Sequence, residues 1–298
     1  MHDRLLDVLA CPNDRATPLQ MALVVGRDHI VDQGELHCPR CDSRFPISHG
    51  IPRFLLLPAD EISDIKQREI DARDRVSQRR TTWDIPTERR PELDALRAAI
   101  GDCRGRRVLD AGCGVGLMTH AVSHADHVVG MDFSFQGLMK FYFPYRTPLD
   151  LVQGDVCQLP FVNATFDLIL TSQVLEHVPS ESSRRAFLDE LARTLAPGGR
   201  LVLTVYNWDA ARQQNGIPKE GFHPNGIFYH CYDASELQEA LAPSFRVEAI
   251  WGLLVALPRT YRLLTALGGA NVYWDRLFRR WPLARRHARL LLAIGRRR

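Results

Sequence analysis

Residues 107–116 read Arg-Val-Leu-Asp-Ala-Gly-Cys-Gly-Val-Gly, and this stretch decides the fold. A short apolar strand leads directly into glycines at three alternate positions, Gly112, Gly114 and Gly116. Glycine lacks the Cβ that would hold a ligand away from the backbone, so the pattern indicates a small-molecule site at the end of a strand. Such turns also bind dinucleotides or only pack tightly, and the glycines alone leave these alternatives open.

Short apolar strands alternate with amphipathic helices after this turn, which is typical of parallel βαβ units. We expect six strands, at 106–113, 127–132, 149–155, 166–173, 200–207 and 245–252. We expect helices that begin near Val115, span 182–195 and span 233–241. The sequence therefore predicts an α/β fold with a Rossmann-like sheet and helices on both of its faces.

Acidic residues stand at the ends of three consecutive predicted strands, as Asp110, Asp132 and Asp155. Ligands of open α/β sheets bind outside the carboxyl ends of the strands. An acid at the end of the second strand, about 20 residues after the glycines, can accept hydrogen bonds from ribose hydroxyls. Leu117 stands where a nicotinamide-binding motif would carry its third small residue, which disfavours a dehydrogenase.

With these motifs, residues 106–207 resemble the cofactor domain of class I S-adenosylmethionine-dependent methyltransferases of the ubiquinone/menaquinone-biosynthesis type. The resemblance implies S-adenosyl-L-methionine as the cofactor, and a seventh strand at 290–294 that completes the sheet. It also implies a set of cofactor-binding residues. These are Asp110, Gly112, Gly114 and Gly116 near the methionine part, Asp132 at the ribose, Asp155 and the Val156 backbone at the adenine, and Gln173 at the cofactor's edge.

Glu176 and His177 follow the fourth predicted strand, beside the position expected for the methyl group. Methyl transfer from a sulfonium is an in-line displacement in which positioning does much of the work. A base is needed only if the acceptor loses a proton in that step. We therefore take Glu176 and His177 as catalytic candidates, with a packing role for His177 as the alternative. The long segment 207–232 predicts a lid that contacts the substrate.

Residues 1–57 form a separate candidate module, which the charged, helical segment 58–104 links to a domain at 105–298. Two pairs of side chains in the module are spaced like the two knuckles of a zinc ribbon. The candidate metal ligands are Cys11, Asp14, Cys38 and Cys41, with His37 and His49 as substitutes. Zinc prefers four thiolate or imidazole ligands, so Asp14 is the unusual member. The alternative is a β-rich cap that binds no metal.

The module resembles the small zinc-ribbon-like family that includes activator subunits of tRNA methyltransferases. The resemblance lies in residues 5–12, 36–41 and 45–52. It implies a small β-rich fold for residues 4–57, which precedes the methyltransferase-like sheet in the chain.

The last 23 residues, 276–298, contain nine arginines and no acid, although the whole chain has a net charge of only +3. We expect a basic helical insertion at about 253–288. A basic amphipathic segment can lie on an anionic membrane, and peripheral membrane contact through this stretch is one interpretation. The other is a helix that packs on the domain with solvated arginines.

The sequence predicts a cytoplasmic protein that can also contact the membrane periphery. Its seven cysteines show no disulfide framework, and its amino-terminal stretch does not resemble a signal peptide. The predicted function is methyl transfer to oxygen or carbon of a small, lipophilic or sugar-containing acceptor. The first alternative is an RNA methyltransferase that holds RNA through the amino-terminal module. A nucleic-acid acceptor is less favoured. Enzymes that methylate exocyclic amino groups of bases usually have Asn/Asp-Pro-Pro-Tyr/Phe here to grip a flipped base, and this chain has Thr-Ser-Gln-Val at 171–174. The second alternative is a non-catalytic cofactor-binding scaffold.

Overall fold

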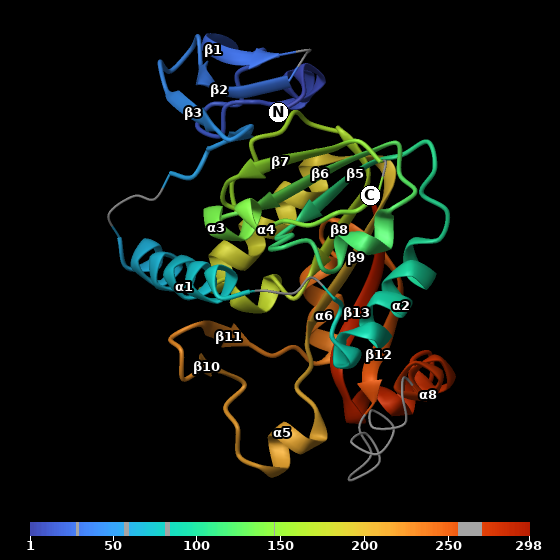
Figure 1. Ribbon diagram of the computed structural model, residues 1–298. Coiled ribbons are helices and arrows are strands. Elements are labelled where there is room, and N and C mark those ends of the chain that lie inside the picture. Colours follow the sequence, from blue (N-terminus) through green and yellow to red (C-terminus); the bar gives the residue numbers. More distant parts are fainter. Residues whose placement is uncertain (28–29, 57–59, 81–83, 146, 256–269) are drawn as a thin grey trace.

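The computed structural model describes residues 1–27, 30–56, 60–80, 84–145, 147–255 and 270–298. Two sheets dominate it, a small antiparallel sheet near the amino terminus and a large sheet of seven strands. Figure 1 shows the small sheet at one end of the large one, with helices packed along the large sheet. A two-stranded ribbon of β10 (Glu220–Phe222) and β11 (Phe228–His230) extends from the carboxyl side of the large sheet.

The amino-terminal module is β-rich, as the sequence predicts. The 3-10 helix η1 (Asp3–Val8) precedes four antiparallel strands whose spatial order follows the sequence. These strands are β1 (Gln20–Arg27), β2 (Ile30–His37), β3 (Arg44–Ser48) and β4 (Ile51–Pro52).

The large sheet has the strand order β12-β13-β9-β8-β5-β6-β7. The strands are β5 (Arg107–Ala111), β6 (His127–Asp132), β7 (Leu149–Gln153), β8 (Phe166–Ser172), β9 (Leu195–Tyr206), β12 (Phe245–Val255) and β13 (Ala288–Arg297). Only β13 runs antiparallel to its neighbours, and it lies between β9 and β12. The structure confirms the Rossmann-like sheet, and the strand predicted at 290–294 lies within β13.

Helices cover both faces of this sheet because successive strand side chains point to opposite sides. Val108 packs in one core cluster with α2 (Arg90–Ile100), whereas Leu109 packs in another with α4 (Glu181–Thr194) and α6 (Ala234–Leu241). The other helices are α1 (Glu61–Gln78), η2 (Thr87–Arg89), η3 (Thr119–Val122), α3 (Phe135–Met139), η4 (Leu175–His177), α5 (Ala210–Gln214), α8 (Ala270–Phe278) and η5 (Pro282–His287).

The helix expected to begin near Val115 is not formed. The chain makes tight turns through Gly116 and then only the 3-10 helix η3 before β6 begins at His127. Thr119 explains part of this difference, because its hydroxyl donates to the Asp110 carboxylate at 2.5 Å and draws the segment against the end of β5. A side-chain hydrogen bond of this kind competes with regular helix formation.

The module is joined to the edge strand β7 of the large sheet. Arg53 forms a parallel bridge with Gln153 of β7, and the backbone N–H of Phe54 donates to the Gln153 carbonyl at 2.7 Å. Leu9 forms an antiparallel bridge with Phe161, and the two side chains share one buried core cluster. The core of the module and the core under the sheet are therefore continuous.

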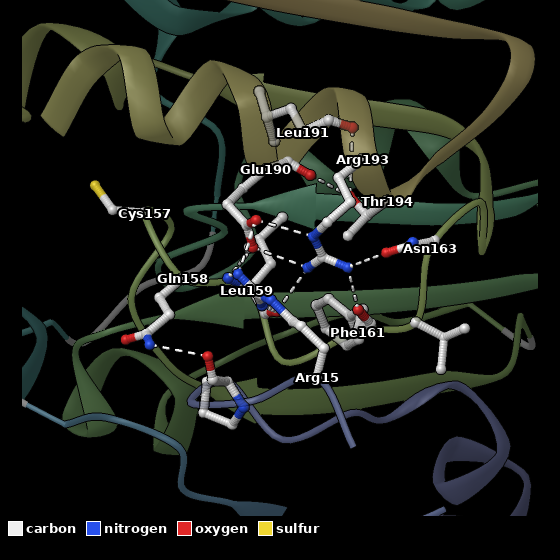
Figure 2. Close-up of polar contacts among 12 residues, drawn as sticks. Arg15, Cys157, Gln158, Leu159, Phe161, Asn163, Glu190, Leu191, Arg193 and Thr194 are labelled. Atoms are coloured by element: carbon white, nitrogen blue, oxygen red, sulfur yellow. Dashed lines mark hydrogen bonds and ion pairs between the residues drawn. The ribbon is translucent and has the colours of Figure 1, made fainter. Parts of the chain in front are cut away.

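A buried carboxylate and two arginines reinforce this junction, as Figure 2 shows. Glu190 of α4 accepts hydrogen bonds from Arg15 at 2.9 Å and from Arg193 at 2.8 Å. Both arginines also donate to the Leu159 carbonyl, at 2.9 Å each. Arg15 belongs to the module, so one carboxylate ties the module to α4 and to the chain that follows β7.

The described residues of the segment 58–104 form α1, η2 and α2, and these helices do more than connect the module to the sheet. α2 contributes Leu93, Leu96 and Ile100 to the core that covers one face of the sheet. α1 lies across the carboxyl ends of the strands (Figure 1) and contacts α3.

Part of the predicted insertion at 253–288 falls outside the described residues, namely 256–269. Residues 253–255 extend β12, and the rest forms α8 and η5 before β13 begins. Among the described residues, no helix combines the length and the hydrophobicity needed to cross a bilayer.

Candidate active site

A cavity of about 400 Å³ lies at the carboxyl ends of β5, β6, β7 and β8, and cavities of ~300–1,000 Å³ are typical of small-molecule sites. α1 closes it from the other side. Eight of the predicted site residues line this cavity, namely Asp110, Gly112, Gly114, Asp132, Asp155, Val156, Gln173 and His177. Gly116 and Glu176 do not line it.

Each glycine of the turn is required for a different local reason. Gly112 has a φ of +81°, and a Cβ there would lie 2.2 Å from Cγ2 of Val174. Gly114 has a φ of +54° and lines the cavity, and nothing lies within 4 Å of the position that its Cβ would take. A side chain at Gly114 would extend into the space left for a ligand.

Gly116 does not line the cavity, and its predicted contact with the cofactor stays a prediction. A Cβ there would lie 2.9 Å from the Phe141 ring, and the φ is +90°. Its backbone N–H donates to the Cys113 carbonyl at 2.9 Å. Gly116 therefore shapes the turn and allows Phe141 to pack, and it does not contact the cavity.

Asp132 and Asp110 lie side by side under the glycine turn. The Asp132 carboxylate accepts the backbone N–H groups of Gly114 at 2.8 Å and Ser134 at 2.9 Å, one on each oxygen. Each carboxylate oxygen keeps a further acceptor position. Burial raises the pKa of both acids, and that of Asp110 reaches about 7. Asp132 is thus fixed in orientation and can still accept hydrogen bonds from a ligand.

Asp155 is paired with a cation from α1. The Lys66 ammonium lies 2.5 Å from its Oδ2, and the backbone N–H of Cys157 donates to its Oδ1 at 2.8 Å. Lys66, Glu69 and Arg73 of α1 line the cavity at helical spacing. The helix therefore presents a polar face to the strand ends.

Gln173 is positioned by a buried acid, Glu92 of α2. Gln173 has a φ of +56°, and its amide donates to Glu92 at 2.8 Å. Glu92 also accepts the hydroxyls of Ser172 and Thr204 at 2.8 Å each, and Arg89 lies 2.8 Å away. Glu92 is 0% exposed. One carboxylate thus connects α2 with the ends of β8 and β9.

His177 lines the cavity in a defined tautomer. Its Nδ1 lies 2.7 Å from the carbonyl oxygen of Phe228, so Nδ1 carries the proton and donates it to that oxygen. Burial, with the charge of Arg73 adding to it, lowers the pKa of His177 to about 3. The ring is therefore neutral at pH 7, and Nε2 is its acceptor atom.

Glu176 is buried and does not line the cavity. Its side chain is 0% exposed, and both carboxylate oxygens lack a hydrogen-bond partner among the described residues. Burial raises the pKa of Glu176 to about 8, so the group is mostly protonated at pH 7. The catalytic prediction for Glu176 is not supported by this position, because η4 (Leu175–His177) turns only His177 toward the cavity.

The candidate metal ligands of the module lie together. One ligand atom from each of Cys11, Asp14, Cys38 and Cys41 lies within 4.8 Å of every other. The Cys11 and Cys41 sulfurs are 3.6 Å apart, and the Cys38 sulfur is 3.5 Å from an Asp14 oxygen. Four ligands about 2.3 Å from one zinc ion in tetrahedral geometry would be separated by roughly 3.8 Å. The four side chains fit such an ion.

Two family models match separate parts of the chain. The first describes a methyltransferase domain and matches residues 109–203, which include the glycine turn, all of β6, β7 and β8, and parts of β5 and β9. The second describes Trm112p-like proteins and matches residues 2–50. Residues 109–203 are a methyltransferase domain, and residues 2–50 are a Trm112p-like domain.

The methyltransferase domain is similar to curated enzymes over part of their length. Demethylmenaquinone methyltransferase of Renibacterium salmoninarum is 34% identical over 110 residues, which cover 37% of this chain and 45% of that enzyme. The chain spans about half the length of the curated relatives it matches, or less.

Two solved structures share the fold. One is 1,6-didemethyltoxoflavin-N1-methyltransferase of Burkholderia thailandensis with bound S-adenosylhomocysteine. It has a TM-score of 0.54 and 20% identity, over 89% of this chain and 99% of that one. The other is from a complex of the Haloferax volcanii Trm112 methyltransferase activator with a methyltransferase. It has a TM-score of 0.52 and 19% identity, over 78% of this chain and 96% of that one.

Sequence reasoning missed the α1 residues and Glu92. A signal for α1 exists, because Lys66, Glu69, Arg73 and Arg80 recur every three to seven residues and so share one face of a helix. Glu92 has no such signal. Its partners Ser172 and Thr204 are 80 and 112 residues away, and only the fold brings them together.

Proposed function

We propose that this protein transfers the methyl group of S-adenosyl-L-methionine to oxygen or carbon of a small acceptor held in the same cavity. The observation that carries the proposal is the open space at Gly114, bordered by Asp132 and Asp155 at the next two strand ends. When bound, the cofactor supplies an electrophilic methyl group on a sulfonium. The chain's own residues bind and orient the two reactants.

The cofactor would be held by the residues that the strand ends present. We assign the ribose hydroxyls to Asp132, whose free acceptor positions allow charge-assisted hydrogen bonds. The adenine would lie near Asp155 and Val156, where Lys66 of α1 closes the cavity. Gly112 and Gly114 would border the methionine part. Gln173 would lie at the edge of the cofactor, where its hydrogen bond to Glu92 fixes the side-chain amide.

His177 would position the acceptor. With its proton held on Nδ1 by the Phe228 carbonyl, Nε2 can accept a hydrogen bond from an acceptor hydroxyl. This directs an oxygen lone pair at the methyl group and gives the departing proton a path. A carbon acceptor would use the same cavity, and the proton that leaves the methylated carbon would pass to Nε2 or to water.

The walls of the cavity support a small acceptor with both apolar and polar parts. Val76, Val178, Pro179 and Tyr206 provide apolar surface, and Arg73 provides a cation. A lipophilic ring or a sugar fits this mixture.

An RNA acceptor is the second candidate, and the Trm112p-like domain is the observation that favours it. Arg53 and Phe54, which follow this domain in the chain, join it to edge strand β7. Binding of RNA would fall steeply with salt concentration, because each neutralised phosphate releases counterions. A small-molecule acceptor would show no such dependence.

We also propose that Cys11, Asp14, Cys38 and Cys41 bind one zinc ion. The mutual spacing of the four ligand atoms supports this. Zinc would act there as a structural ion, because four protein ligands complete its coordination.

The decisive experiment is calorimetric titration of the purified chain with S-adenosyl-L-methionine. We expect binding, and we expect Asp132→Ala to weaken it about ten-fold or more, since hydrogen bonds to a charged group contribute roughly 1.5–3 kcal/mol. Asp132→Asn preserves the side-chain shape and should give an intermediate affinity.

Asp71→Ala is the matched control, because Asp71 is an exposed acid of α1 whose side chain accepts a hydrogen bond from Gln67 and does not line the cavity. Its affinity should equal that of the unaltered chain. An unaltered chain that does not bind the cofactor, or an Asp132→Ala variant that folds and binds at full strength, would refute the proposal.

A further inference from the structure

α8 and η5 carry a surface that combines exposed apolar side chains with arginines. Four large apolar side chains are at least half exposed there, namely Tyr273 at 74%, Leu277 at 72%, Trp281 at 52% and Leu283 at 71%. Three exposed arginines stand between and beside them, Arg276, Arg280 and Arg286. We call these seven residues the α8–η5 surface.

The opposite side of the same segment is anchored to the domain. Asp275 accepts the backbone N–H of Leu254 at 2.7 Å, and Asn271 donates to the Thr87 carbonyl at 3.1 Å. Arg279 donates to Asp94 of α2 at 2.8 Å. Because these buried polar contacts fix the orientation of α8, its apolar side chains are held outward.

The charge of this surface is positive throughout. No acid occurs between Arg276 and Arg298 in the sequence. Arg276 pairs with Asp94 of α2, and Arg280 lies 4.9 Å from the centre of the Trp251 ring. Within the described ranges, neither Arg280 nor Arg286 forms an ion pair. The surface therefore offers arginines to an anionic partner.

We propose that the α8–η5 surface binds the surface of anionic membranes. Trp and Tyr favour the boundary between headgroups and acyl chains, and protruding Leu side chains gain by insertion below it. Arginines around them would pair with lipid phosphates, because cations near an anionic surface are attracted to it. A nucleic acid would use the arginines but would leave Leu277 and Leu283 in water.

The sheet register places this surface at the cavity edge of the molecule. Leu290 of β13 pairs with Leu253 of β12 on one side and with Tyr206 of β9 on the other. Tyr206 lines the cavity. Figure 1 shows α8 beside the carboxyl end of β12. Membrane contact would therefore turn the strand ends toward the bilayer. The proposal of membrane binding does not depend on methyl transfer.

Asn207, the residue after Tyr206, also connects the α8–η5 surface with the cavity side of the molecule. The Asn207 side-chain amide donates to the carbonyls of Arg285 and Ala288, at 2.7 Å each. η5 is therefore fixed to the start of the 207–232 segment, which also supplies the Phe228 carbonyl that orients His177.

The test is co-sedimentation of the full chain with vesicles of phosphatidylcholine alone or of phosphatidylcholine with one-quarter phosphatidylglycerol. We expect binding to the anionic vesicles, at least about ten-fold weaker binding to the neutral ones, and a decrease as salt is raised. The double variant Leu277→Glu/Leu283→Glu should lose about ten-fold or more, as should Arg280→Glu/Arg286→Glu.

Matched controls lie in the Trm112p-like domain. Val25 is 63% exposed, so Val25→Glu makes the same kind of change far from α8. Arg44→Glu is the corresponding charge reversal at an exposed arginine. Both should bind vesicles like the unaltered chain. All altered side chains are exposed, but Arg44 pairs with Glu35 at 3.0 Å and Arg280 lies over the Trp251 ring, so thermal unfolding is measured for each variant.

Three results would overturn the proposal. The first is no binding to the anionic vesicles, or equal binding by the double leucine variant. The second is a dimer in sedimentation equilibrium that Leu277→Glu converts to a monomer, which would assign the surface to a second copy of the chain. The third is RNA binding that the arginine changes abolish and the leucine changes leave intact.

Discussion

At the scale of single residues, hydrogen-bond partners distinguish two acids near the strand ends that are equally buried. Glu176 has no partner for either oxygen among the described residues, whereas Glu92, equally buried, accepts hydrogen bonds from three side chains. The pKa of Glu176 is raised to about 8, and its burial is the main cause. An acid that holds its proton only in the folded state makes stability depend on pH.

Glu176 should destabilise the fold as pH rises. The unfolded carboxyl loses its proton near pH 4.5 and the folded one near pH 8, so the folded state binds more protons in between. The free energy of unfolding therefore falls as pH rises through this window. We expect Glu176→Gln to gain about 1–4 kcal/mol relative to the unaltered chain between pH 5 and pH 8.

Urea unfolding at several pH values measures this difference. Glu239→Gln is the control, because Glu239 is exposed. Its difference from the unaltered chain should stay constant with pH. A constant difference for Glu176→Gln would show that the folded carboxyl is ionised.

At the scale of elements, much of the sheet could be predicted. The expected 127–132 strand coincides with β6 (His127–Asp132), and the expected helix at 182–195 differs from α4 (Glu181–Thr194) by one residue at each end. An apolar run in β6 and the helical spacing of Phe187, Leu188 and Leu191 in α4 fix these elements locally. The helix expected near Val115 does not form, in part because the hydroxyl of Thr119 donates a hydrogen bond to Asp110. The spacing of apolar residues in the sequence does not predict this contact.

α2 depends on one carboxylate for its attachment to the strand ends. Removing Glu92 leaves the Ser172, Thr204 and Gln173 side chains without their shared acceptor. We expect Glu92→Ala to lower the free energy of unfolding by about 3 kcal/mol, since buried polar groups lose their partner. Because Gln173 is released as well, affinity for S-adenosyl-L-methionine should also fall.

Chemical denaturation and calorimetry provide the two measurements. Glu88→Ala serves as the comparison, because Glu88 is exposed in η2 and its change should stay within about 0.5 kcal/mol. A loss below about 1 kcal/mol for Glu92→Ala would mean that water replaces the carboxylate without penalty.

At the scale of the whole molecule, the Trm112p-like domain and the large sheet share one core. Leu5, Leu9 and Phe45 belong to the same buried cluster as Met131 and Phe161. The sequence indicates a module followed by a domain, but it contains no signal for this contact. The bridge between Leu9 and Phe161 joins residues far apart in the chain.

Removal of zinc should therefore weaken the entire protein. We expect a chelator, or Cys38→Ala, to lower the midpoint of thermal unfolding in a single transition, because metal-binding free energy is folding free energy. Elemental analysis should give one zinc per chain. Cys103→Ala is the control, because this thiol is buried in the other core cluster and far from the four ligands. Its zinc content should be unchanged.

Two separate transitions after chelation would contradict the shared core. They would show that the Trm112p-like domain can unfold while the large sheet stays intact. A full zinc content in Cys38→Ala would instead contradict the ligand assignment.

The position of β13 has a consequence for how the protein is made. A ribosome releases β9 and β12 before β13, yet β13 is the strand that lies between them. Until it emerges, the nascent sheet has an open edge at β9, and β12 has no neighbour to pair with. Exposed strand edges of this kind favour aggregation, and chaperones shield such intermediates. Assembly of this side of the sheet must therefore wait for translation to pass Arg297.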